Sequence, residues 1–386
     1  MLVFASLVHA TCTHRSSCSH NGECSPVGTC SCTSAWTGEY CEKLRLLPGR
    51  RSLGYQGKDV DGSLLSSWGG APLRADDGTY HMLVSEMANG AGLLPWACNS
   101  RVIHATSDDP LTQPFVKRRE LFGLFSHEPR CTRAPAGGPF VCLFSHNPDY
   151  HLLPHAAACH GNGHGSSLLS CNCNNGGPKP TYMTHTTDLN GNWSLPVLVA
   201  NVSCDANVSP YIFANGSLLA LYRNNIGSNI HLLTAADWRD PGSYKLGTAN
   251  LPGGLFLPED PFLWRDAHGV FHSLQHNYPW PAGPHAWSLD GYTWQLAPNH
   301  ALDAYGPNAT FVDAPLISGG CRERPSLIFA ADGTTPIALV NGFSPNPSKV
   351  GATPSGSCRY SGIDYSFTLI QPIATEQVEL EASPSY

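Results

Sequence analysis

The residues best suited to proton-transfer chemistry in this chain are carboxylates at the ends of strand-like segments. Glu259 and Asp260 are adjacent and stand directly before a proline, Glu323 precedes a similar segment, and Glu86 ends another. When such groups are brought together, one can donate a proton while another stays ionised and activates or attacks a reacting atom. We therefore expect these four residues to be the catalytic candidates.

Glu323 has an arginine on each side, Arg322 and Arg324. Neighbouring guanidinium groups favour the charged form of a carboxyl group, and they can also bind a hydroxyl or carboxylate of a ligand. The alternative interpretation is an ion-pair cluster that only stabilises the fold.

A strand–turn–strand unit carries the first carboxylate pair. The unit reads EDPFLWRDAHGVFHSLQHNY over residues 259–278, with turn residues between two apolar runs. Weaker copies recur four more times. They begin at residues 68, 138, 209 and 322.

Five units of roughly 50–70 residues, each with three or four short strands, are typical of a β-propeller, because one blade cannot bury both of its faces without neighbours. The 38 glycines and 32 prolines, spread along the chain, agree with many turns between short strands. We expect an all-β, five-bladed propeller over residues 58–376; a two-sheet sandwich is the alternative. A proline should open the innermost strand of each blade. These prolines are Pro72, Pro139, Pro210, Pro261 and Pro325.

Polar residues at equivalent strand ends are the candidates for ligand binding, since equivalent ends converge on one surface of a propeller. Trp68 and Trp264 offer flat apolar faces, although packing inside a blade is the alternative for both, and Asp61 lies just before the first unit. The strand-end candidates are His146, Asn147, Arg223, Asn224 and His276.

Charge and hydropathy exclude several classes of protein. The net charge of −7 and the 13% content of charged residues exclude a strongly basic nucleic-acid-binding protein. The part of the chain after residue 10 contains no run of the roughly 18 to 20 apolar residues that a membrane span requires. The 386 residues, 41% of them hydrophobic, suffice for a large core.

Six cysteines lie between residues 12 and 42, a segment too small to fold on a hydrophobic core alone. Their spacing, with Asn-Gly before the third and Trp-Thr-Gly-Glu-Tyr before the sixth, resembles an EGF-like module over residues 11–42. The resemblance implies a protein-contact or spacing role, or a disulfide-stapled cap, and no calcium is expected. It also implies the pairs Cys12–Cys24, Cys18–Cys30 and Cys32–Cys41.

Fifteen cysteines together with five glycosylation sequons indicate an oxidising, secretory compartment. Residues 1–10 resemble the end of a signal peptide, 43–57 a linker, and 377–386 a C-terminal tail. The sequons are at Asn192, Asn201, Asn207, Asn215 and Asn308.

The insertion at residues 151–179 carries cysteines and histidines, which are good zinc ligands. Their spacing matches no zinc signature, so a disulfide-tied loop is the preferred interpretation. Since the chain also lacks a glycine-rich phosphate loop, we expect neither a metal nor a cofactor.

The repeat resembles the five-bladed propellers of glycoside hydrolase family 43 and related sugar hydrolases. The resemblance spans about residues 59–371 and rests on SSWGGAP, NSRVIHATSDDPLTQPF, EDPFLW, HGVFHSL and RERPSLIF. It implies a carbohydrate ligand at the channel mouth and hydrolysis of a glycosidic bond by paired carboxylates.

The chain departs from the family pattern at two blade openings. Ala71 and Ser209 stand where the family has acidic residues, and only the fourth unit keeps Glu259 and Asp260. A glycan-binding or adhesion protein without catalysis is therefore the alternative function.

Overall fold

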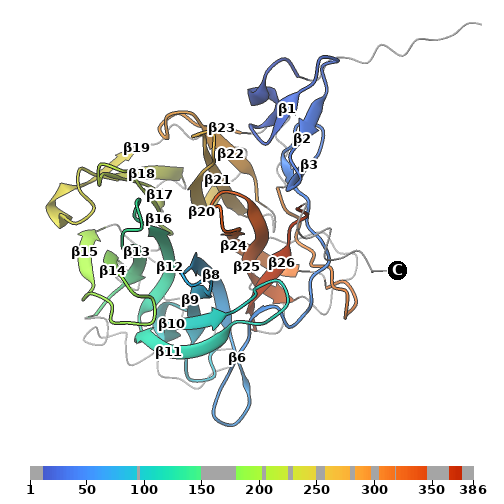
Figure 1. Ribbon diagram of the computed structural model, residues 1–386. Helices are drawn as coiled ribbons and strands as arrows, with labels where there is room; N and C mark the ends of the chain where they lie inside the picture. Colours follow the sequence, from blue (N-terminus) through green and yellow to red (C-terminus); the bar gives the residue numbers. More distant parts are fainter. Residues whose placement is uncertain are drawn as a thin grey trace, which may run out of the picture.

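Five four-stranded antiparallel sheets surround a central axis in the computed structural model, which confirms the expected all-β, five-bladed propeller (Figure 1). The first strand of each sheet contacts the first strands of its neighbours and is therefore innermost. The structure describes residues 12–93, 96–148, 180–201, 206–224, 229–248, 257–278, 283–296, 304–317, 319–345 and 365–375.

The blades follow the chain in order. From the axis outward, blade one has β8 (Ser67–Arg74), β9 (Tyr80–Met87), β10 (Ser100–Ser107) and β11 (Val116–Phe122). Blade two has β12 (Ser126–Arg133), β13 (Phe140–His146), β14 (Thr181–Thr186) and β15 (Val197–Ala200). Blade three has β16 (Ser209–Ile212), β17 (Leu218–Asn224), β18 (Asn229–Ala235) and β19 (Tyr244–Thr248).

Blade four has β20 (Leu257–Arg265), β21 (Phe271–Tyr278), β22 (His285–Ser288) and β23 (Gln295–Leu296). Blade five has β24 (Gly319–Phe329), β25 (Pro336–Pro345), β26 (Phe367–Pro372) and β5 (Gly54–Tyr55). Three short hairpins lie outside the blades: β1 (Gly22–Cys24) with β2 (Cys30–Cys32), β3 (Trp36–Thr37) with β4 (Lys43–Leu44), and β6 (Gly57–Lys58) with β7 (Leu64–Leu65). The helical turns within the described residues are η1 (Arg15–Cys18), α1 (Trp96–Asn99) and η4 (Pro241–Ser243).

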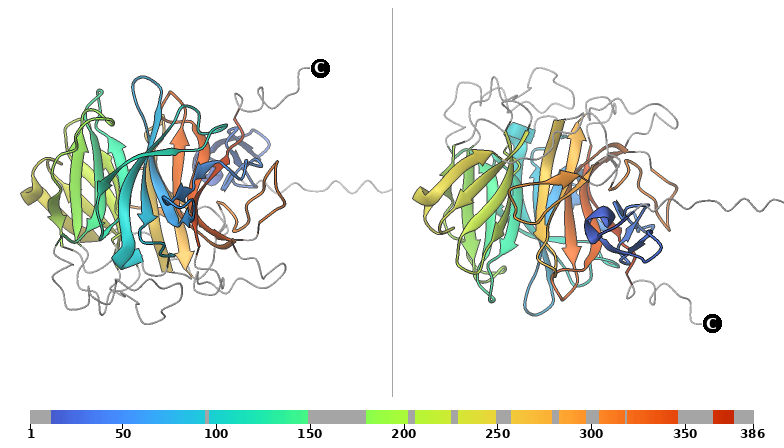
Figure 2. Two further views of the ribbon diagram at one scale, coloured as in Figure 1. Left: turned by 90° about the horizontal axis from the view of Figure 1, so that it is seen from below. Right: turned by 90° about the horizontal axis from the view of Figure 1, so that it is seen from above.

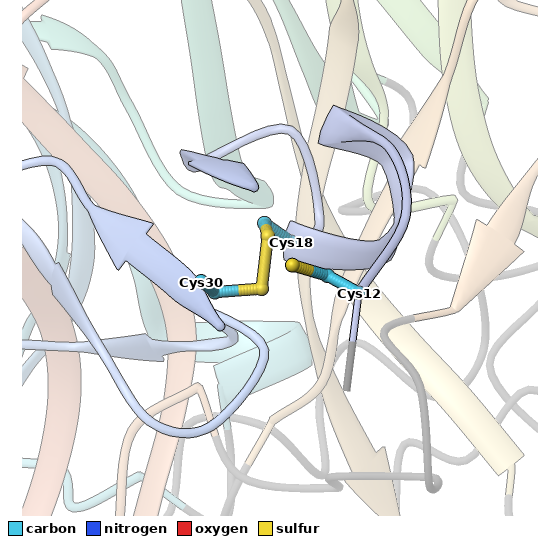
Figure 3. A group of neighbouring side chains, drawn as sticks. All are labelled: Cys12, Cys18 and Cys30. Carbon is cyan, nitrogen blue, oxygen red and sulfur yellow. A yellow bond between two sulfur atoms is a disulfide. The ribbon is translucent and has the colours of Figure 1, made fainter. Parts of the chain in front are cut away.

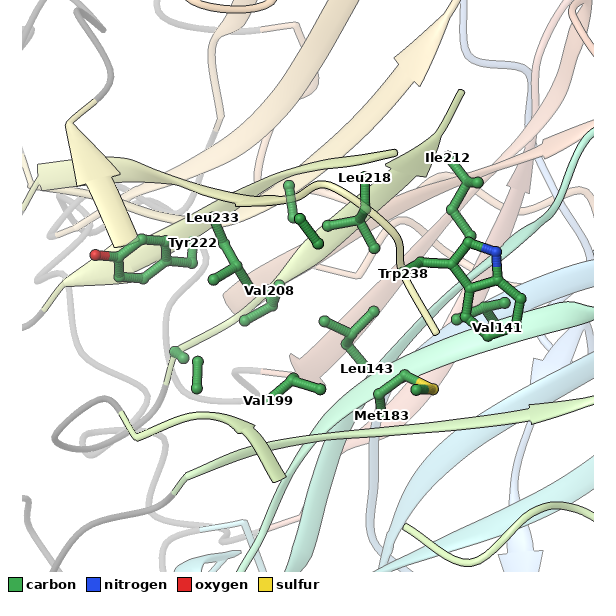
Figure 4. Close-up of a cluster of buried hydrophobic side chains, with 14 of the residues drawn as sticks. Val141, Leu143, Met183, Val199, Val208, Ile212, Leu218, Tyr222, Leu233 and Trp238 are labelled. Atoms are coloured by element: carbon green, nitrogen blue, oxygen red, sulfur yellow. The ribbon is translucent and has the colours of Figure 1, made fainter. Parts of the chain in front are cut away.

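Apolar side chains hold neighbouring blades together. Between blades two and three, Leu143 and Met183 face Val208 and Leu218 in one buried cluster that also includes Trp238 (Figure 4). Because each strand alternates its side chains between the two faces of its sheet, every blade presents one apolar face to each neighbour. The ring buries both faces of the inner strands in this way, whereas the outermost strand β19 is mostly exposed.

The innermost strand of blade two is not the one that the sequence indicated. Pro139 lies just before β13, the second strand of the blade, and the innermost strand is β12, which contains Pro129. The β12 sequence, SHEPRCTR, has polar residues at most positions and so lacks the apolar run that marks the other inner strands. In the other blades the expected proline lies within the innermost strand instead of opening it.

The ring is closed by residues from both ends of the propeller. In blade five the outermost strand is β5, whose Gly54 and Tyr55 pair with Leu369 and Thr368 of β26. Residues 43–57, expected as a linker, therefore include β4, β5 and the start of β6.

Glu86 anchors this closure and is not at the channel mouth. Its carboxylate is fully buried and accepts hydrogen bonds from the Tyr55 hydroxyl, from Arg101 at 2.6 Å and from Lys117 at 2.7 Å. With these partners in place, the carboxylate joins β5 to blade one. The catalytic role expected for Glu86 is replaced by a structural one.

Changing Glu86 to Gln is expected to lower the free energy of unfolding by about 1–3 kcal/mol, because a fully buried carboxylate would lose charge-assisted hydrogen bonds from Arg101 and Lys117. The urea unfolding midpoint measures this loss. Glu120→Gln is the matched control, since exposed Glu120 bonds the same Arg101 at 3.1 Å and should cost at most about 1 kcal/mol. Equal midpoints for the two variants would contradict the structural role.

The cysteines at the N-terminus form a disulfide-rich segment, residues 12–44. Its bonds are Cys12–Cys24, Cys18–Cys30 and Cys32–Cys41, the pairs that the resemblance implied. Figure 3 shows the Cys18–Cys30 bond beside Cys12. A further disulfide, Cys131–Cys142, joins β12 to β13.

The disulfide-rich segment packs against blade four and does not stand apart from the propeller (Figure 2). Trp36 lies 4.8 Å from the ring of His285, the Asn21 amide approaches His285 Nδ1 at 3.5 Å, and the Leu44 N–H donates to the carbonyl of Ala304. Among the described residues, no helix has the length and apolar character of a membrane span.

Candidate functional site

Five equivalent residues, one from each blade, form a ring where the innermost strands begin. All five have a left-handed backbone, and in blades one, two, four and five the pairing register shifts at this point. A non-glycine residue in this conformation costs free energy and persists only where surrounding contacts compensate. The ring residues, with their φ angles, are Gly69 (62°), Glu128 (58°), Asn207 (43°), Asp260 (54°) and Arg324 (52°).

Polar contacts connect four of the ring residues. The Asn207 amide donates to Asp260, and the Arg324 backbone N–H donates to Asp260 at 3.2 Å. The Arg324 guanidinium lies 2.7 Å from a Glu128 oxygen and 3.4 Å from Asp260. A Cβ atom at Gly69 would stand 3.0 Å from the Arg324 side chain, so the missing side chain makes room for the arginine.

A second group of side chains lies next to the ring on blades three, four and five. Glu259 precedes the ring residue of blade four; one of its oxygens lies 2.5 Å from Arg223 and the other 3.0 Å from His276 Nδ1. The opposite nitrogen of His276 lies 3.7 Å from Glu323. The side chains of Glu259 and Glu323 keep 12% and 16% exposure, whereas those of Asp260 and Glu128 keep 4% and 5%. Glu259 and Glu323 are therefore the carboxyl groups more open to a ligand.

The environment drives the pKa values of these two carboxyl groups in opposite directions. Burial raises the pKa of Glu323 to about 8, and the negative charges of Glu259 and Asp260 add to the rise against the opposing effect of His276. Burial also opposes ionisation of Glu259, but the charge of Arg223 and the hydrogen bond from His276 outweigh it and lower the pKa. These opposite shifts favour the protonated form of Glu323 and the ionised form of Glu259, which is how acid and base roles are divided between two carboxyl groups.

Glu259, His276 and Glu323 each offer a ligand atom within 4.8 Å of the others, a grouping that could hold a metal ion. However, the two imidazole nitrogens face different carboxyl groups. Burial lowers the pKa of His276, but Glu323 and Glu259 outweigh it and raise the pKa to about 9. An imidazole that keeps its proton near neutral pH is a poor metal ligand, so the arrangement favours hydrogen bonding over metal binding.

Other candidates from the sequence lie elsewhere in the fold. Arg322 is fully buried and donates to oxygens of Asn341, Gly306, Asn308 and Gln371, so it secures blade five instead of binding a ligand. Arg324 pairs with Glu128 and Asp260. The pKa of Glu323 is raised, so the two arginines beside it do not hold it in its charged form.

The expected sugar-stacking tryptophans are packing residues. Trp264 is 7% exposed and stacks on His272 at 5.1 Å. Trp68 is 4% exposed, and a Cβ atom at Gly342 would lie 2.5 Å from its indole ring. Although Trp68 occupies the blade-one position that corresponds to Glu259, its ring fills space that Gly342 leaves open.

The remaining polar candidates are spread out. Asp61 lies in the exposed turn between β6 and β7. His146 bonds Ser126 at 2.9 Å, and Asn147 bonds the Phe125 carbonyl through its backbone. The side chain of Asn224 lies outside the described part of the structure.

Asn207 is a ring residue and not an exposed glycosylation site. It is 3% exposed, and its amide nitrogen, the atom a glycan would occupy, donates to Asp260. The other four sequon asparagines are exposed, as attachment requires. They are Asn192, Asn201, Asn215 and Asn308.

Glu128 belongs to the site and was missed from the sequence. The Glu128-Pro129 pair corresponds to Asp260-Pro261 and Arg324-Pro325, so a charged residue directly before a proline is a signal that the sequence contains. The sequence instead indicates Pro139 as the landmark of blade two, because the strand that follows Pro139 is apolar and the strand with Pro129 is polar.

A cavity of about 460 Å³ lies at the opposite end of the inner strands. Its rim arginines secure neighbouring turns: Arg133 pairs with Asp76, and Arg265 donates to the carbonyl of Gly269 at 2.8 Å. The lining of this cavity does not include Glu259, Glu323 or the ring residues, so the cavity is separate from the candidate site. Its apolar walls include Leu73, Tyr211, Phe262, Trp264, Leu327 and Phe329.

Similarity to known proteins exists at the level of structure. No protein-family model and no curated protein matches the sequence. A family 117 glycoside hydrolase from the marine bacterium Zobellia galactanivorans has a TM-score of 0.52 at 10% identity, over 89% of this chain and 91% of that one. A thermostable family-43 glycoside hydrolase has a TM-score of 0.50 at 11% identity, over 84% of this chain and 92% of that one. At these identities the likeness establishes the shared propeller fold.

Proposed function

We propose that the protein hydrolyses glycosidic bonds at the channel mouth beside Glu259 and Glu323, with Glu323 as the proton donor. The observation that carries this proposal is the opposite direction of two pKa shifts in carboxyl groups whose nearest ligand atoms lie within 4.8 Å. A protonated and an ionised carboxyl group side by side are what glycoside hydrolysis requires. The glycoside hydrolase fold of the structural neighbours supports the same activity.

The expected reaction begins with proton transfer from Glu323 to the glycosidic oxygen as the bond to the anomeric carbon breaks. The charge of Glu259 stabilises the positive charge that develops on the sugar ring. Arg223 holds Glu259 ionised and keeps 22% of its side chain exposed, which allows it to bind a sugar hydroxyl.

A secreted protein fits this function. The four disulfides whose two cysteines both lie in the described part of the chain, together with four exposed sequon asparagines, support an oxidising, extracellular location. The disulfide-rich segment resembles an EGF-like module and offers a surface for protein contact.

Hydrolysis of a panel of phenyl and nitrophenyl glycosides tests the proposal. The wild-type protein is expected to turn over at least one member, and Glu323→Gln should lower kcat for its phenyl glycoside by about 10²- to 10⁴-fold. Glu120→Gln, the same change in an exposed residue of blade one, should leave kcat unchanged. Equal rates for Glu323→Gln and wild type would refute the assignment of the proton donor.

Glycan binding without turnover is the second candidate function. It is favoured by the Asp260 carboxylate, which is committed to contacts with Asn207 and Arg324. It is also favoured by Ser209 and Ala71, which stand where the family resemblance implies acids. Binding on a glycan array, with no hydrolysis of any panel member, would establish this function and exclude the first.

A further inference from the structure

One oxygen of Glu128 is buried without a partner. Glu128 Oε1 lies 2.7 Å from the Arg324 guanidinium and 3.4 Å from His127, whereas Oε2 makes no hydrogen bond with any described residue. A buried carboxylate oxygen is costly to leave unpaired, so such an atom normally binds water or a ligand.

Three further atoms without a hydrogen bond among the described residues belong to the ring residue of the next blade and to a residue of the same strand as Glu128. Asn207 holds the corresponding ring position in blade three, and its Oδ1 lacks a hydrogen bond within the described structure. Arg130 follows two residues after Glu128, is 2% exposed, and has both Nε and Nη2 unpaired among described residues. Water can satisfy acceptors and donors of these kinds, since one molecule donates two hydrogen bonds and accepts others.

Surrounding contacts fix the position of Glu128. Its backbone N–H donates to the Ser85 hydroxyl at 2.8 Å, which supports the left-handed conformation. The preceding His127 bonds Ser100 at 2.6 Å and stacks on Trp96 at 4.5 Å. A reactive group held in this way is preorganised and loses little freedom during a reaction.

We infer that Glu128 is the general base that activates the hydrolytic water, an inference that rests on the proposed function. Glu128 Oε2 takes a proton from the water while the water oxygen bonds to the anomeric carbon. The bond from that carbon to the leaving oxygen breaks, and this oxygen takes the proton of Glu323. Glu128 gains one proton and Glu323 loses one, so the reaction balances with water as the only reactant besides the glycoside.

The test compares Glu128→Gln, Glu128→Asp and Glu128→Ala with wild type on phenyl and 2,4-dinitrophenyl glycosides. Glu128→Gln is expected to lower kcat by about 10²- to 10⁴-fold on both substrates, because water must attack in each case. Glu323→Gln should lower kcat on the phenyl glycoside far more than on the dinitrophenyl glycoside, whose leaving group needs no proton. Glu128→Asp keeps the charge opposite Arg324 and should fold normally while losing at least tenfold in kcat.

Azide provides a readout that a purely structural role would not change. In Glu128→Ala, added azide should replace water, accelerate release of dinitrophenol and yield a glycosyl azide detectable by NMR. Wild-type kcat within threefold for Glu128→Gln would overturn the inference, as would an absence of glycosyl azide from Glu128→Ala protein whose circular dichroism spectrum matches that of the wild type. Either outcome leaves hydrolysis by the wild-type protein intact, whereas a wild-type protein inactive on every glycoside overturns both proposals.

Discussion

Arg324→Met is expected to remove most of the stability of the propeller. The guanidinium contacts both Glu128 and Asp260, and all three side chains are at most 5% exposed. Breaking a buried ion pair costs about 3–5 kcal/mol because the remaining charge stays buried without compensation. Here two carboxylates lose the same partner, and whole domains are stable by only about 5–15 kcal/mol.

Thermal and urea unfolding measure this effect. Arg239→Met is the matched control, since Arg239 is 59% exposed in its pair with Asp237 and should change the free energy of unfolding by less than about 1 kcal/mol. Adding Glu128→Gln to Arg324→Met should recover part of the stability, because it removes one uncompensated charge. An unfolding midpoint for Arg324→Met equal to that of the control would contradict the structural importance of the ring.

The second large effect is on the pH dependence of hydrolysis. Since the pKa of Glu323 is raised to about 8, this group is protonated below that pH and loses its proton above it. The value of kcat/KM should therefore hold through neutral pH and then fall by about tenfold per unit on the alkaline side. The low pKa of Glu259 means that this carboxylate stays ionised over the same range.

Glu323→Gln identifies the group responsible. Glutamine does not titrate, so the variant should show weak activity without an alkaline fall near pH 8. If the fall persists in the variant, another group, with His276 the nearest alternative, controls the profile and the assignment of Glu323 is wrong.

The fold could be predicted because its signals are local. Phe262–Trp264 and residues 270–274 show strand patterns on either side of a turn, and the pattern recurs through the chain. Blade two broke the pattern because its inner strand lines a polar part of the channel. A strand whose side chains pair with buried charges does not have an apolar sequence.

The site was only partly predictable, because chain neighbours are not always neighbours in space. Arg322 and Glu323 are adjacent in sequence, but adjacent side chains of a strand point to opposite faces. Arg322 therefore holds the outer part of blade five, while Glu323 faces the negative charge of Glu259, and its pKa rises instead of falling. Similarly, nothing local shows that Asn207 bonds Asp260 from another blade.

The closure of blade five has a consequence for how the chain folds. Ser67 and Thr368 bond each other although they are 301 residues apart, and β26 pairs with β5 from the start of the propeller. During synthesis the first four blades emerge as an open arc, and the ring cannot close until almost the whole propeller has been made. Contacts at such long range slow folding and leave strand edges exposed meanwhile. The disulfide-rich segment emerges before this arc, and its three short cross-links join only cysteines of that segment, so their formation does not require the last strand.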